Sequence, residues 1–148
     1  MKRIMLALST YRHSQTAVEA AIEQAQEGKR LIIVYVIDVN LARYLIGSDI
    51  GTFQSLKETY ESELLDKHRV LAAERIAGMV TQAEHCGINV STHITTGRFA
   101  LECLEIMQTE QPDVIVTTRS KRPKWVKRFF GSPVDYLKSH AQCPVIEA

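Results

Sequence analysis

Six cations lie within ten residues near the end of the chain, in the stretch whose composition is best suited to bind an anion. They are Arg119, Lys121, Arg122, Lys124, Lys127 and Arg128. No Asp or Glu lies between residues 119 and 128, so the positive fields of these side chains add. Gly131 and Ser132 follow, and Pro133 suits the first turn of a helix, where its missing N–H costs nothing. The free N–H groups and the dipole of a helix start also favour an anion.

The basic segment has three open interpretations. It is a solvated surface loop, or it binds a small anion such as phosphate, or it contacts nucleic acid, an acidic protein or a membrane surface. Trp125, Phe129 and Phe130 interleave with the cations, as in the third class. Some of these aromatic side chains must pack beneath the segment, so we expect no nucleic-acid partner. Ser132 has two interpretations that share one geometry, a helix cap and an anion contact.

The remaining reactive residue types do not form a recognisable catalytic or metal site. Ser9 and His13 lie close in sequence, but no acid or thiol stands beside them, so we expect Ser9 to be a turn residue and the protein not to be an enzyme. The three cysteines, Cys86, Cys103 and Cys143, are widely spaced and lack a CxxC pair. We expect reduced thiols in or near the core, and no metal.

Length and composition indicate one domain over residues 1–148. The 45% hydrophobic and 24% charged content is ordinary for a globular chain. No apolar run approaches the roughly 20 residues of a membrane span. The opening MKRIMLALS has an apolar core of about five residues, shorter than the ~7–15 of a signal peptide, so it predicts a strand. We therefore expect a cytoplasmic protein.

Hydrophobic periodicity predicts five strands alternating with four helices. Continuous apolar runs at 3–8, 31–37 and 114–117 indicate buried strands, and 143–148 indicates a last short strand. Ile88, Val90, Thr92 and Ile94 alternate with polar residues, which predicts a half-exposed strand at an edge of the sheet. Helices are predicted after Ser14, over 54–86, between Gly97 and Pro112, and after Ser132. This order gives an open, doubly wound parallel α/β sheet, whose ligands bind at the carboxyl ends of the strands.

The ordered landmarks of the chain resemble the universal stress protein family. They are Lys2–Ala7, His13-Ser14, Val34–Asp38, Gly97, Asp113–Val116, Gly131-Ser132 and Cys143–Val145. The resemblance covers almost the whole chain and implies a Rossmann-like fold, similar to adenine nucleotide alpha hydrolases, with strand order 3-2-1-4-5. It places a crevice between the first and fourth strands, where Ser9–His13 would face residues 118–121.

The family's ATP-binding loop reads Gly, two residues, Gly, nine residues, Gly-Ser. Gly131-Ser132 matches its end, but Thr118 and Lys121 stand at the first two glycines. Ser9 stands where nucleotide binders of the family have an Asp. Those glycines allow the backbone to approach a phosphate, and a β-branched residue adopts positive φ only at a cost. The candidate nucleotide- or anion-binding residues are Ser9, Thr10, Val36, Thr117, Thr118, Arg119, Lys121, Gly131 and Ser132.

The resemblance implies a cytosolic, non-catalytic stress-response domain with a degenerate nucleotide loop. The alternative is a retained AMP- or ATP-binding regulator in which Arg119 and Lys121 replace glycine contacts with charge. A hydrolase would need an acid–base pair, which the sequence does not offer. We expect no required cofactor, although AMP, ATP or a phosphate-like anion is an open ligand. The family also implies a homodimer through the strand at 143–148, and a further protein partner is open.

Overall fold

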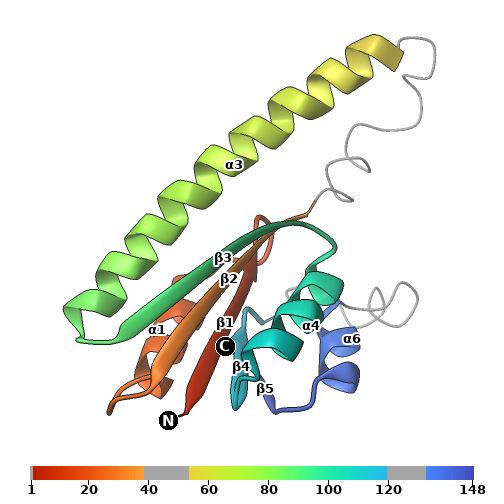
Figure 1. Cartoon of the computed structure of the whole chain (residues 1–148). Coiled ribbons are helices and arrows are strands. Elements are labelled where there is room, and N and C mark those ends of the chain that lie inside the picture. The colour runs from red at the N-terminus through yellow and green to blue at the C-terminus, as the bar shows by residue number, and fades with distance from the viewer. Residues whose placement is uncertain (1, 39–53, 120–132) are drawn as a thin grey trace.

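The computed structural model describes residues 2–38, 54–119 and 133–148, with residues 54–61 described by their backbone alone. Five strands form one parallel sheet in the order β3-β2-β1-β4-β5 (Figure 1). The strands are β1 Arg3–Ser9, β2 Arg30–Asp38, β3 Asn89–Gly97, β4 Val114–Thr117 and β5 Val145–Glu147. The helices are α1 Gln15–Gln24, α3 Gln54–His85, α4 Phe99–Glu110 and α6 Pro133–His140. The predicted doubly wound sheet, its order and its four helices are confirmed.

Both faces of the sheet are covered, which is why the interiors of the central strands β1 and β2 show no polar alternation. Ile4, Leu6 and Leu8 of β1 pack on one side with α1 and α3. Met5 and Ala7 pack on the other side with α4 and α6. Side chains alternate across a strand, so a strand buried on both faces shows no polar alternation.

The helix boundaries follow local signals in the sequence. Ser14 caps α1 as predicted, since its Oγ accepts a hydrogen bond from the N–H of Ala17 at 3.2 Å. Helix α4 ends through Gln111, whose φ of 50° is left-handed and whose N–H bonds the carbonyl of Met107. Among the described residues, no helix combines the length and apolarity needed to cross a lipid bilayer.

The edge position and the half-exposed character predicted for β3 are confirmed, and the apolar side that begins with Ile88 and Val90 packs on the core only at the start of the strand. Thr92 is exposed and Ile94 is 50% exposed, whereas His93 and Thr95 on the other side are half-buried. Helix α4 covers the His93 side, and His93 Nε2 lies 3.1 Å from Glu110 Oε1. Helix α3 is about 48 Å long at 1.5 Å per residue, and it runs on past the sheet in Figure 1. It leaves Thr92 and Ile94 uncovered.

The prediction that all three cysteines lie in or near the core is wrong for one of them. Cys103 is buried in α4 and Cys143 is half-buried before β5, but Cys86 is exposed. Cys86 follows the last residue of α3, in the turn that Gly87 completes with a φ of 73°. A turn residue between two elements has no layer above it to bury its side chain.

Candidate ligand crevice

The carboxyl ends of β1, β2 and β4 bring together the described members of the predicted site. Ser9 is in register with Val36 of β2, and Ala7 of the same strand is in register with Thr117 of β4. The direction of winding reverses between β1 and β4, which is where open α/β sheets place their ligands. Thr10, Thr118 and Arg119 continue these strands. Lys121, Gly131 and Ser132 lie outside the described residues.

Ser9 is a turn residue in this structure, as its sequence neighbourhood predicts. Its backbone N–H donates to the carbonyl of Arg12 at 3.0 Å, and its Oγ accepts from the N–H of Arg12 at 3.1 Å. The side chain is buried and carries no charge. The Thr10 N–H donates to the carbonyl of Val36 at 3.3 Å, so this turn is tied to β2 as well.

The end of β4 is paired rather than open. Thr117 is fully buried, and its Oγ1 donates to the carbonyl of Ala7 at 2.8 Å. The carbonyl of Thr117 accepts from the N–H of Ala148 at 2.9 Å, and the N–H of Arg119 donates to the carbonyl of Ala148 at 3.0 Å. Strand-like pairing therefore continues through Arg119, and the backbone donor of Arg119 is already used.

Thr118 fills the position where the resemblance places a glycine. Its side chain is 7% exposed, and its Oγ1 is buried without a hydrogen-bond partner. Among the described residues, Glu27 and Gln111 are the non-glycine residues with positive φ, so Thr118 has a negative φ. The left-handed conformation open to glycine is not used here.

Arg75 of α3 bonds the turn that follows β1, and the sequence did not predict this contact. Its Nη1 donates to the carbonyl of Thr10 at 3.0 Å and to Oη of Tyr35 at 2.7 Å. Tyr35 is fully buried in β2, so Arg75 provides the partner that its hydroxyl needs. The signal was a cation at an inward position of the apolar stripe formed by Ala72, Ile76 and Met79.

Two titratable groups of the turn are shifted by their surroundings. Burial lowers the pKa of His13, and the positive charge of Arg75 lowers it further. Burial raises the pKa of Tyr11, with a smaller contribution from the charge of Asp38. His13 Nδ1 and Thr10 Oγ1 are both buried without a partner. Within the described residues, no three His, Cys, Asp or Glu side chains could hold a metal ion.

Comparison with known proteins gives one family match and several solved structures with a similar fold. The model of the "Universal stress protein family" matches residues 1–146. A search of the curated proteins gives no match. The structure of UspA from Lactobacillus plantarum is similar with a TM-score of 0.72 at 23% identity, covering 98% of this chain and 96% of that one.

Two further solved structures are similar to this chain. Hypothetical protein MJ0577 gives a TM-score of 0.71 at 19% identity, covering 100% of this chain and 96% of that one. A universal stress protein family protein from Arabidopsis thaliana with AMP bound gives 0.55 at 16% identity, covering 99% and 90%. At these identities the structures show the fold alone. The family match over nearly the whole length shows that the chain belongs to the universal stress protein family.

Proposed function

We propose that this protein is a non-catalytic regulatory domain of the cytosol whose crevice no longer binds ATP in the manner of the family's nucleotide binders. The observation that supports this most is Thr118, whose buried side chain stands at the position of the loop's first glycine. A phosphate cradle needs backbone N–H groups that approach the anion without a Cβ in between. Here the next N–H, that of Arg119, is bonded to Ala148 instead.

The turn after β1 supports the same proposal. A carboxylate that addresses a nucleoside hydroxyl accepts charge-assisted hydrogen bonds, which are about twice as strong as neutral ones. Ser9 has no charge, and its Oγ already accepts from Arg12. The site has therefore lost contacts on both sides of the crevice.

The chemistry of the turn also supports a non-catalytic role. A general base must present an unshielded lone pair at a reacting proton. His13 Nδ1 is buried without a partner, and the positive charge of Arg75 disfavours its protonation. Cys103 is fully buried, and burial raises the pKa of its thiol, so it is not a nucleophile at neutral pH.

The experiment is a thermal-shift titration of the wild type and of the triple variant Ser9→Asp, Thr118→Gly, Lys121→Gly with ATP. A ligand at 100 times its Kd stabilises the folded state by about 2.7 kcal/mol. We expect no shift for the wild type at millimolar ATP and a shift of several degrees for the triple variant. A matched triple variant that carries Thr118→Ala keeps a Cβ at this position, and we expect it to gain less. If the wild type shifts by several degrees, the proposal fails.

The alternative, a retained AMP, ATP or phosphate-like ligand, is favoured by one specific observation. Thr10 Oγ1 and Thr118 Oγ1 are polar atoms without partners at the same end of the sheet, and buried hydroxyls normally have one. Solved structures of the family with cAMP and with AMP bound have this fold. Mass spectrometry of what the denatured protein releases separates the two proposals, because a stoichiometric adenine nucleotide would favour the alternative.

We also propose that the protein forms a homodimer through the free edge of β5. Ala148 directs its N–H to Thr117 of β4, so alternation along the strand directs the N–H groups of Val145 and Glu147 to the free side. Ile146 is 38% exposed on this strand, and an isologous pairing hides both edges. Val145→Pro removes an outward donor without touching the pairing with β4, and sedimentation should show weaker self-association than that of the wild type.

A further inference from the structure

The two edges of the sheet differ in how well they are protected against pairing. Strand β5 has three residues, follows Pro144 and carries Glu147, whose Oε2 lies 2.7 Å from Lys138 Nζ. Short length, proline and charge limit how much of an edge can pair, so β5 offers only a short interface. Strand β3 has nine residues in one-to-one register with β2, without a bulge. It contains no Pro, Lys, Arg, Asp or Glu.

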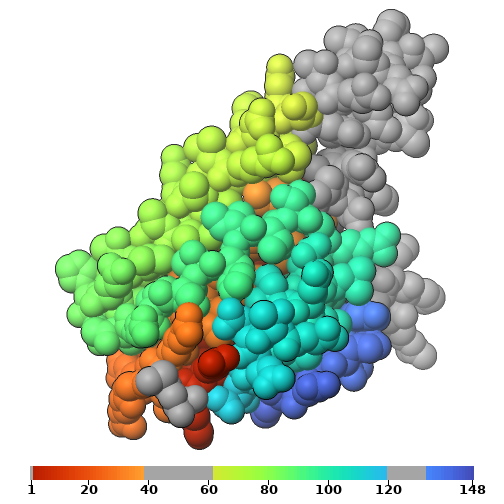
Figure 2. Space-filling model, in the orientation of Figure 1, coloured from red at the N-terminus to blue at the C-terminus, as the bar shows by residue number. Residues whose placement is uncertain are grey.

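The part of β3 that α3 leaves uncovered carries an exposed apolar side chain between two hydroxyls. Ile94 is 50% exposed, and Thr92 and Thr96, two residues away on the same side, are exposed. Space-filling atoms of β3 reach the surface between α3 and α4 (Figure 2). A strand of nine residues is about 30 Å long at ~3.3 Å per residue, which is enough to pair with a full strand of another chain.

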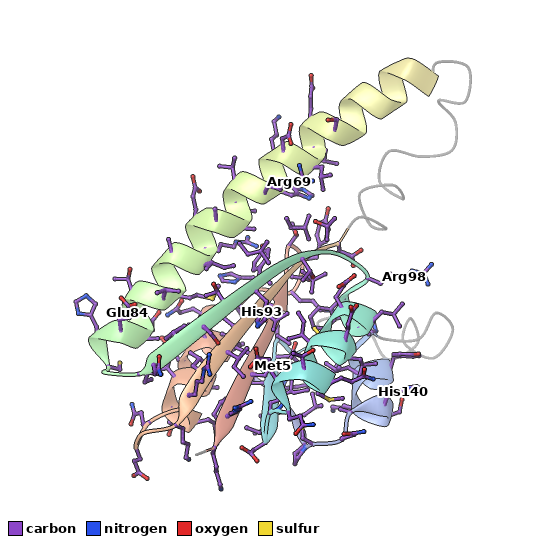
Figure 3. All side chains as sticks on the ribbon, viewed as in Figure 1. Met5, Arg69, Glu84, His93, Arg98 and His140 are labelled. Atoms are coloured by element: carbon purple, nitrogen blue, oxygen red, sulfur yellow. The ribbon has the colours of Figure 1, made fainter. Side chains whose placement is uncertain are left out.

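Opposite charges stand at the two ends of this strand. Glu84, in the last turn of α3, lies near its start, and Arg98 directly follows its end (Figure 3). Both residues are exposed, and neither makes an ion pair with another described residue. An antiparallel neighbour reverses the two ends, so each charge then faces its opposite.

We propose that β3 of one copy pairs antiparallel with β3 of a second copy, about a two-fold axis near Ile94. The two five-stranded sheets then form one continuous sheet. The axis brings the Ile94 side chains of the two copies together on the uncovered side, within reach of cross-strand contact. In this register Arg98 of each copy lies opposite Val90 of the other, at the end of the strand near which Glu84 of α3 lies, so Arg98 and Glu84 can form two equivalent ion pairs.

A second copy fits this edge because the strand complements itself. Pairing about a two-fold axis uses the same backbone groups on both sides and needs no special partner sequence. Arg98 can pair with Glu84 of the second copy, and Ile94 can contact Ile94 of the second copy. Every contact of this interface therefore comes from one chain sequence. Because β3 and β5 lie on opposite edges, this interface is independent of the β5 pairing proposed above, and both together give assemblies larger than a dimer.

The test is sedimentation equilibrium of the full chain in the Val145→Pro background, which removes an outward donor of β5. We expect this variant to dimerise still. Arg98→Glu should weaken that dimer about tenfold, because two attractive pairs become two repulsive ones. The swap Arg98→Glu with Glu84→Arg should restore it. Both changes suit the helix ends where they lie, so the fold is kept. Glu23→Arg, on the exposed side of α1, is the control and should change nothing.

Ile94 gives a second, independent measurement in the same background. Ile94→Lys should dissociate the dimer, whereas Ile94→Val should retain it within a few-fold. Circular dichroism of each variant shows whether it is folded, and the charge swap provides its own rescue. A monomeric Val145→Pro protein that is folded would overturn the proposal. So would a dimer indifferent to Ile94→Lys, or a swap variant no tighter than Arg98→Glu alone.

Discussion

Replacing Arg75 by methionine should destabilise the protein through a hydroxyl that lies in the core. Methionine keeps the length and apolar stem of the side chain but donates no hydrogen bond. Tyr35 Oη, 2.7 Å from Nη1, is then left in a fully buried side chain without its partner. A buried polar group left unsatisfied costs about 1–3 kcal/mol. The carbonyl of Thr10, 3.0 Å away, is only partly buried and can turn to water, so its loss adds less.

We therefore expect Arg75→Met to lower the free energy of unfolding by about 2–3 kcal/mol. For a chain of this size that is a fall in Tm of about 4–12 °C. Urea unfolding followed by circular dichroism measures the change. The double variant Arg75→Met, Tyr35→Phe should recover about 1 kcal/mol or more, because the orphaned hydroxyl is gone.

The matched control is Tyr35→Phe alone, which leaves Arg75 its bond to Thr10 and should cost about 1 kcal/mol. The single and double variants form a cycle whose coupling energy reports the contact itself. Two results would refute the reasoning. One is a loss below about 0.5 kcal/mol for Arg75→Met, which is the scale of an ordinary surface substitution. The other is strict additivity in the cycle.

The structure also predicts how stability depends on pH and how fast the individual thiols react. The pKa of His13 is lowered on folding, so the unfolded chain binds more protons and stability falls as pH drops through 6.5 toward the folded value. His13→Gln should flatten this part of the pH profile, and NMR titration should find the imidazole pKa below 6.5; a higher value would contradict the assignment. Among the thiols, exposed Cys86 should react with a thiol reagent at once under native conditions, whereas Cys103, buried and with a raised pKa, should react only on unfolding. Equal rates would show that the α4 core opens readily.

Much of the fold follows from local patterns that tertiary packing reinforces. The interiors of β1 and β2 are continuously apolar because helices cover both faces, and few other arrangements of a strand produce that pattern. Ser14 marks the start of α1 by a capping hydrogen bond that is local to the chain. The exposure along β3 was harder to predict, because alternation does not show how far a covering helix extends. Val90 packs on the core whereas Ile94 is exposed, and this difference depends on where α3 leaves the sheet, which is a long-range property.

The residues of the crevice also fall into two groups, those that sequence spacing located and those that only the fold brings together. The resemblance located Ser9, Thr117 and Thr118 from sequence spacing, because strand ends are fixed by the strands themselves. Arg75 was out of reach of a motif, since it comes from the middle of a 32-residue helix and meets the turn only through the fold. The pairing of Arg119 with Ala148 was also invisible, because it joins segments whose proximity depends on the register of β4 and β5.

The central claim is that the side chain of Thr118 and the uncharged Ser9 leave no ATP site in the family's manner. Isothermal titration calorimetry of the purified wild-type chain with Mg-ATP, at a protein concentration of about 100 µM so that a weak site gives measurable heat, tests it most directly. The proposal predicts no saturable heat at millimolar ATP. A saturable isotherm with one ATP per chain and a Kd in the micromolar range would contradict it.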